Sequence, residues 1–145
     1  DIPIQESFLG IKVHTATKKN THLRFFRKSF GGYGGERFHE SAVVTGPTVS
    51  LNGAINHYGD ISIDLKIDKT NKYSSGKSLD KFDQGKKSKL IKLLTIFPLM
   101  FVKSYFLRRN FLNGRRGLIG SMLNAFYAFL KEAKLYELEL KSGKD

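Results

Sequence analysis

The hydrophobic and polar positions divide the chain into short apolar runs before residue 60 and long apolar runs after it. In the first part, the runs are separated by Gly, Pro and Asn, which is typical of β-strands joined by turns. We predict strands at residues 8–13, 23–27, 38–45 and 49–51. Residues 29–35 contain four glycines and are expected to form a loop.

Two patterns compete over residues 61–81. Every second position from Ile61 to Ile67 is apolar, as in a strand. However, Ile63 and Ile67 also lie four residues apart, and Asp60 is a suitable helix N-cap. We favour a helix here, chiefly because of the family resemblance described below.

Two further helices are expected nearer the C-terminus. Residues 88–107 contain Pro98, which predicts a kink or an interruption there. Residues 118–138 place Met122, Phe126, Phe129 and Leu130 on one apolar face. The chain is therefore expected to divide into a strand-rich part, residues 1–60, and a helical, basic extension, residues 61–145.

The net charge of +12 indicates an anionic partner. Residues 84–130 contain nine Lys or Arg and neither Asp nor Glu. The apolar runs at 90–102 and 118–130 are shorter than the roughly 20 residues that cross a bilayer. A cationic chain with such runs is typical of a membrane-surface segment, so we expect an anionic membrane surface as partner.

Nucleic acid is the alternative anionic partner, because bases stack on aromatic side chains that lie among cations. The aromatic residues of 97–111 fit that requirement, but the many Leu and Ile residues of 90–99 favour lipid. We therefore expect no nucleic-acid partner. The chain has no cysteine, which excludes disulfides and thiolate metal sites.

Candidate chemical groups gather between residues 23 and 60. Glu40 follows the glycine-rich loop and can act as a general base; alternatively it is a surface carboxylate paired with Arg37 or Lys28. His57 can bind a divalent metal or a phosphate, or it can be a hydrogen-bonded structural histidine. Three cations can either contact a diphosphate or remain solvated at a strand edge, namely Arg24, Arg27 and Lys28.

Several short motifs, in order along the chain, resemble one family. They are Leu23-Arg24-Phe25-Phe26-Arg27-Lys28, Phe38-His39-Glu40-Ser41, His57-Tyr58, Lys66, Asn71 and Tyr73, followed by Gly85-Lys86-Lys87, Pro98-Leu99, Lys103-Ser104-Tyr105, Phe111-Leu112, Gly117-Leu118-Ile119 and Phe129-Leu130-Lys131. Together they resemble the C-terminal half of family 2 glycosyltransferases. The most similar group is the bacterial one that adds sugars to lipopolysaccharide core and related surface glycans.

The resemblance implies an α/β fold: the C-terminal part of a GT-A-like nucleotide-sugar fold, with short strands followed by three amphipathic helices. It implies an inverting glycosyltransferase that moves a sugar from a nucleotide-sugar donor to a lipid-linked or lipopolysaccharide glycan acceptor. It also implies a divalent metal, Mg or Mn, and a cytoplasmic location, peripheral on the inner face of the cytoplasmic membrane.

The same resemblance assigns roles to individual residues. Glu40 matches the catalytic base, and His57 matches a histidine that helps to hold the metal or the diphosphate. Residues expected to bind substrate are Arg24, Arg27, Lys28, His39 and Lys66. The Asp-x-Asp motif of the family precedes this region and is absent from these 145 residues, so the resemblance implies that they are a fragment or a diverged remnant of the enzyme, inactive alone. The alternative function is a non-enzymatic basic module that binds a membrane surface or nucleic acid.

Overall fold

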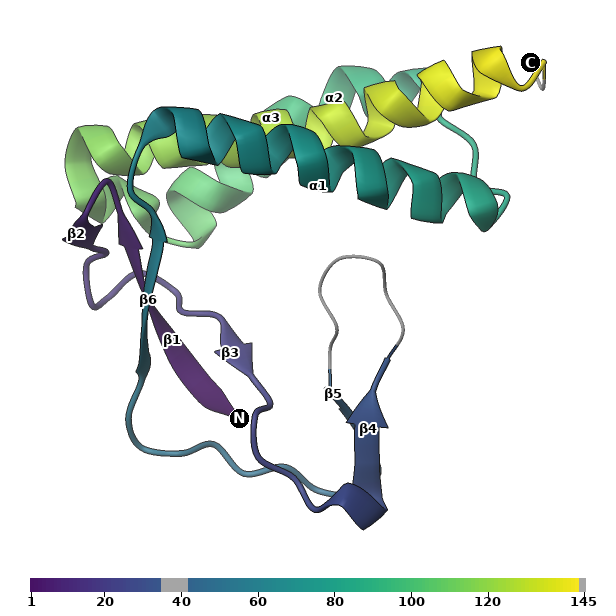
Figure 1. Ribbon diagram of the computed structural model, residues 1–145. Coiled ribbons are helices and arrows are strands. Elements are labelled where there is room, and N and C mark those ends of the chain that lie inside the picture. Colours follow the sequence, from purple (N-terminus) through teal and green to yellow (C-terminus); the bar gives the residue numbers. More distant parts are fainter. Residues whose placement is uncertain (35–41, 144–145) are drawn as a thin grey trace.

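The computed structural model describes residues 1–34 and 42–143, which form a strand-rich part below a layer of helices (Figure 1). The strands are β1 (Ile2–Phe8), β2 (Ile11–Lys12), β3 (Thr21–His22), β4 (Gly31–Tyr33), β5 (Ala42–Val44) and β6 (Ile55–Asp60). The long helices are α1 (Ile63–Asp83), α2 (Leu90–Val102) and α3 (Gly114–Lys141). Three shorter turns are η1 (Lys28–Phe30), η2 (Lys103–Leu107) and η3 (Asn110–Asn113). The expected mixture of short strands followed by three helices is confirmed.

Strand β1 organises the larger sheet. It pairs antiparallel with β2 and β3 and parallel with β6. The β1–β2 turn is Leu9-Gly10, and both residues have positive φ, which is the geometry of a tight hairpin turn. Ile2 and Ile4 are buried, and the strand carries the only buried large apolar side chains described in this sheet.

The strand predictions were only partly correct. Ala42–Val44 is a strand, as expected, and it pairs with β4 in a second, two-stranded sheet. Residues 23–27 and 49–51 form no strand, and residues 8–13 are the end of β1, a turn and β2. Aromatic and β-branched residues favour a strand only where a neighbouring strand is available, and Phe25 is instead 77% exposed.

Strands β1, β3, β4 and β6 were not predicted, apart from the end of β1, and the last two illustrate why. Gly31–Tyr33 lies within the expected glycine-rich loop, and a Cβ at Gly31 would lie 2.4 Å from the carbonyl oxygen of Val43. Only glycine therefore fits this pairing without a shift. The other strand, β6, contains Asn, His and Gly and is formed through its pairing with β1.

The predicted helices are present, but the N-cap of the first one, α1, differs from the predicted residue. Helix α1 begins after Ser62, whose Oγ accepts a hydrogen bond from the Leu65 amide at 3.1 Å. Ser62, rather than Asp60, is thus the N-cap. The helical assignment over residues 61–81 is confirmed, because the segment packs one face on α3 instead of joining the sheet.

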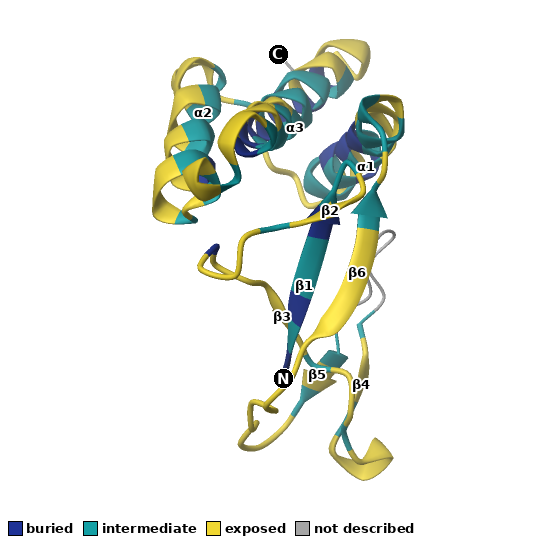
Figure 2. Ribbon diagram, turned by 90° about the vertical axis from the view of Figure 1, so that its left-hand side faces the viewer, coloured by how far each residue is buried: buried dark blue, intermediate teal, exposed yellow. Residues whose placement is uncertain are grey.

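Helix α3 packs against both α1 and α2, and it lies between them in Figure 2. The buried positions of α1 and α3 are mostly small residues, which allow close approach of neighbouring backbone. These residues are Thr70, Ser74, Gly76 and Ser78 on α1 and Gly117, Ser121, Ala125 and Ala128 on α3.

Helix α2 is apolar around most of its circumference, so it is not amphipathic in the expected sense. It contains no buried residue, and its exposed side chains include Leu90, Ile91, Leu94 and Leu99. The helix continues through Pro98 and changes to π-helical geometry only at Lys103–Leu107, so the expected interruption lies after the proline.

The apolar helical segment that could cross a membrane is longer than the apolar run of residues 90–102 noted in the sequence. Leu90–Leu107 has 18 residues and a mean hydropathy of 1.7, which meets the length and composition of a membrane-crossing helix. Only 6% of it is buried. Eighteen residues span about 27 Å, slightly less than the roughly 30 Å hydrocarbon core of a bilayer.

Candidate functional site

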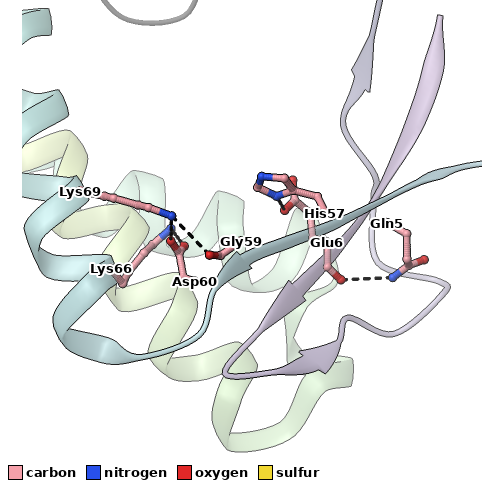
Figure 3. Close-up of polar contacts among 7 residues, drawn as sticks. All are labelled: Gln5, Glu6, His57, Gly59, Asp60, Lys66 and Lys69. Carbon is pink, nitrogen blue, oxygen red and sulfur yellow. Dashed lines mark hydrogen bonds and ion pairs between the residues drawn. The ribbon is translucent and has the colours of Figure 1, made fainter.

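His57 and Glu6 face each other across the parallel strands β6 and β1 (Figure 3). They are register partners, and Nδ1 of His57 lies 2.8 Å from Oε2 of Glu6. Both side chains remain accessible, with exposed fractions of 59% and 39%. A Cβ at Gly59 would lie 3.1 Å from the imidazole ring, so this glycine leaves room for the ring. The pair therefore offers an imidazole and a carboxylate to a ligand in solution.

Asp60, at the end of the same strand, forms the second polar group of Figure 3. Its carboxylate lies 2.8 Å from Nζ of Lys66 and 3.1 Å from Nζ of Lys69. Lys69 also donates to the Gly59 carbonyl oxygen at 3.3 Å. Burial alone would raise the pKa of Asp60, but the two ammonium groups outweigh it and hold the pKa below its ordinary value of 3.8.

The other predicted site residues are spread over the chain. Arg24, Arg27 and Lys28 are exposed and lie between β3 and the end of η1. Arg27 lines a hollow of about 460 Å³ beside β5, whereas His57 lies on β6. Lys66 is near the His57 strand but is paired with Asp60. His39 and Glu40 lie outside the described residues.

A metal site needs several donor side chains close together. The described residues contain no cluster of three or more His, Asp or Glu side chains that could hold a metal ion. His57 fits as one ligand of such a site through Nε2, because its Nδ1 is engaged by Glu6 and imidazole is a suitable donor for Mn²⁺. A complete coordination shell needs further donors.

Sequence reasoning missed both the partner of His57 and a polar cleft between β1 and α3. Glu6 lies 51 residues from His57, and only the β1–β6 pairing brings them together. The cleft has a volume of about 380 Å³ and is bordered by β1, residues 13–20, the turns η2 and η3, and α3. The sequence contains one indication of this cleft, namely the three basic pairs Lys18-Lys19, Arg108-Arg109 and Arg115-Arg116. Each pair contributes at least one side chain to the cleft lining.

Comparison with known proteins places these features in context. An uncharacterized glycosyltransferase of Rickettsia typhi is 36% identical over 132 residues, which is 85% of this chain and 45% of the relative. The lipopolysaccharide core biosynthesis glycosyltransferase LpsC of Rhizobium meliloti is 32% identical over 122 residues, 83% of this chain and 45% of LpsC. The chain is homologous to bacterial glycosyltransferases.

This homology confirms the resemblance inferred from the ordered motifs. A glycosyltransferase of Rickettsia prowazekii gives the same result, at 36% identity over 132 residues. The chain spans less than half the length of these curated relatives. No family model matches the sequence. No solved structure matches it either.

Proposed function

We propose that this chain is the acceptor-side portion of an inverting family 2 glycosyltransferase with a GT-A-like fold. Its substrates are a nucleotide-sugar donor and a lipid-linked or lipopolysaccharide glycan acceptor. The observation that carries the proposal is homology over 85% of the chain to glycosyltransferases, one of which is named for lipopolysaccharide core biosynthesis. In this proposal, residues 1–60 belong to the catalytic domain and residues 61–145 form its helical extension.

Glu40 is the proposed catalytic base. Its carboxylate removes the proton from the acceptor hydroxyl, and the resulting oxygen attacks the anomeric carbon as the nucleotide diphosphate leaves. One direct displacement of this kind inverts the anomeric centre. Substrate-binding roles are proposed for Arg24, Arg27, Lys28, His39 and Lys66.

A divalent metal, Mg or Mn, neutralises the leaving diphosphate when it is bound. His57 is its proposed ligand in this chain, and the Glu6 carboxylate at 2.8 Å orients the imidazole. Because the pair is exposed, a diphosphate can approach it without rearrangement of the strands.

The helical extension is proposed to dock on the inner face of the cytoplasmic membrane. Helix α2 supports this, because its Leu and Ile side chains are exposed and cations precede and follow it, among them Lys86, Lys89 and Arg109. An interfacial helix combines an exposed apolar surface with cations that attract anionic lipid headgroups. The same observation favours the second candidate function, a non-enzymatic membrane-surface module.

A transfer assay separates the two candidates. The full-length protein is incubated with radiolabelled nucleotide-sugars, one at a time, and a lipopolysaccharide core acceptor, with Mg²⁺ or Mn²⁺ and with a chelator as control. The enzyme proposal predicts label in the acceptor for at least one donor, and loss of that label with the chelator. Absence of labelled product with every donor, together with binding to anionic vesicles, would support the non-enzymatic module instead.

A further inference from the structure

Besides Lys66, which is paired with Asp60, five cationic side chains border the cleft between β1 and α3, and we call this cleft the basic pocket. They are Lys18, Lys19, Lys103, Arg108 and Arg116. They come from three regions of the chain that are distant in sequence: the loop after β2, the η2–η3 turn and the first turns of α3. The fold therefore concentrates positive charge at one place.

The carboxylates that border the basic pocket offset only part of this charge. Asp60 is already paired with Lys66 and Lys69, and Glu6 is hydrogen bonded to His57. Within the described part of the chain, the five cations have no carboxylate partner. Like charges that share one cleft repel each other, so an anion bound there would be stabilised by all of them.

The two arginines are held in place by neutral acceptors. Arg116 donates to the carbonyl oxygens of Phe8 and Ile11, at 3.5 and 3.3 Å, and Arg108 donates to Oδ1 of Asn20. These bonds orient the guanidinium groups but leave their charge uncompensated. Each group retains other N–H donors, because a guanidinium has five of them.

The N-terminus of helix α3 adds a positive electrostatic potential, which also favours an anion. Its first turn contains no acidic residue, and its N-cap Asn113 makes no side-chain capping hydrogen bond. Asn113 instead accepts from the His14 amide at 2.7 Å and donates to Thr17 Oγ1 at 3.0 Å, which fixes the loop against the helix. The positive end of a 28-residue helix dipole thus points to the same region as the cations.

We propose that the basic pocket binds a phosphate group, as a phosphomonoester or phosphodiester. Its volume of about 380 Å³ accommodates a small phosphorylated ligand. Two sources carry this chemistry: a free phosphorylated compound and the headgroup of a membrane lipid. Phe106 and Leu107, which lie between Lys103 and Arg108 in the sequence, have exposed side chains and add apolar surface beside these two cations. The phosphate of a lipid headgroup therefore fits this pocket as well as the phosphate of a free compound does.

Two binding assays on the full-length protein test this proposal directly, without any requirement for sugar transfer. Inorganic pyrophosphate is titrated calorimetrically, and sedimentation is measured with phosphatidylcholine vesicles that contain or lack phosphatidic acid. The test variant is Lys19→Gln/Lys103→Gln. The matched control is Lys72→Gln, which removes an exposed lysine on α1 outside the pocket. Thermal unfolding of each variant checks that the fold is intact.

The proposal predicts that the double variant weakens binding about tenfold or more in at least one assay, while Lys72→Gln binds as the wild type does. Weakened pyrophosphate binding identifies a free phosphate ligand, and weakened binding to phosphatidic acid vesicles alone identifies a lipid headgroup. The proposal is overturned if the wild type binds neither probe, if the double variant binds both normally, or if the control loses as much affinity.

Discussion

At the scale of single residues, Glu132 joins the three helices. It lies on α3 with a side chain only 1% exposed, and its Oε2 is 2.8 Å from Nζ of Lys81 on α1 and 3.1 Å from Nζ of Lys92 on α2. Its other oxygen, Oε1, is buried without a hydrogen-bond partner in the described structure. One carboxylate therefore compensates two ammonium groups from different helices.

Replacement of Glu132 by Gln is expected to lower the free energy of unfolding by about 3 kcal/mol, because it leaves two lysines near an uncharged buried group. Urea denaturation measures this change. Glu137→Gln is the matched control: Glu137 pairs with Lys141 on the exposed side of the same helix at 2.6 Å. Its loss should leave the free energy of unfolding almost unchanged, because the pair is solvated. Equal effects of the two variants would contradict the role of Glu132.

Glu132 also makes the free energy of unfolding depend on pH. Burial alone would raise its pKa, but the hydrogen bonds from Lys81 and Lys92 outweigh burial and hold the pKa below the ordinary value of 4.5. A carboxyl group with a lowered pKa in the folded state stabilises the protein above the unfolded pKa, and this contribution is lost as the pH falls through the folded pKa.

The difference in unfolding free energy between wild type and Glu132→Gln should therefore shrink when the pH falls from about 6 to about 3. Urea denaturation at a series of pH values measures it. A difference that stays constant over this range would show that the carboxylate charge does not provide the stabilisation.

Gly117 permits the closest backbone approach at the start of α3. A Cβ there would lie 1.8 Å from the Asn110 carbonyl oxygen, so Gly117→Ala is expected to destabilise the protein by about 1–3 kcal/mol. Gly120→Ala is the control, because its Cβ would meet only the Phe8 ring at 3.6 Å, an ordinary contact. Alanine there should stabilise the helix slightly. Thermal unfolding that ranks the two variants in the opposite order would contradict the packing described.

The sequence offered candidate chemical groups but not their partners. His57 was a candidate from its residue type, its position and the family resemblance, whereas Glu6 was not, because its contact with His57 depends on strand register. The three-helix contact of Glu132 depends on tertiary packing in the same way. Arg24, Arg27 and Lys28 stay predictions, since they are exposed and the described structure gives them no ligand contact.

At the scale of elements, helices were predicted better than strands. A helix forms its backbone hydrogen bonds internally, so the local pattern was sufficient for α3. For α1 the pattern left strand and helix open, and the family resemblance decided between them. A strand needs a neighbour: residues 23–27 have strand-like composition without a partner, and β6 has a poor strand composition with one. The hydrophobic pattern of a short segment does not show whether a neighbouring strand will be available to pair with it.

Helix α2 tests the membrane proposal at this scale. Ile91→Gln/Leu94→Gln replaces two side chains that are 71% and 69% exposed, so the melting temperature should not fall. Binding to anionic vesicles should weaken about tenfold or more, because each side chain contributes on the order of 1–2 kcal/mol when it enters lipid. The control is Val49→Gln, 75% exposed and outside the helices. Unchanged vesicle binding by the α2 variant would contradict membrane docking through this helix.

At the scale of the whole molecule, few apolar side chains are buried compared with those that are exposed. The described buried ones are Ile2, Ile4, Ala125, Ala128 and Leu135, whereas most of α2 and much of β6 face solvent. The chain also matches less than half the length of its relatives. We expect exposed apolar residues outside α2, such as Tyr58, to contact protein segments that the relatives possess and these 145 residues do not include.

Charge is the second property of the whole molecule. The net charge of +12 was visible in the sequence, but its distribution was not. The fold gathers cations from both halves of the chain at the basic pocket, and it uses others to compensate Asp60 and Glu132. Composition therefore predicted an anionic partner, and the basic pocket is the place where we propose that a small anion binds.

The central claim, that this chain supplies the catalytic base of a glycosyltransferase, is tested most directly by the transfer rate of the Glu40→Gln variant. The full-length protein is assayed with the donor that gives labelled acceptor, beside Glu36→Gln as a control for loss of a nearby carboxylate. A lost general base lowers kcat by about 10²- to 10⁴-fold, so we predict a loss of that size for Glu40→Gln and a near-normal rate for Glu36→Gln. A wild-type rate in Glu40→Gln would contradict the account.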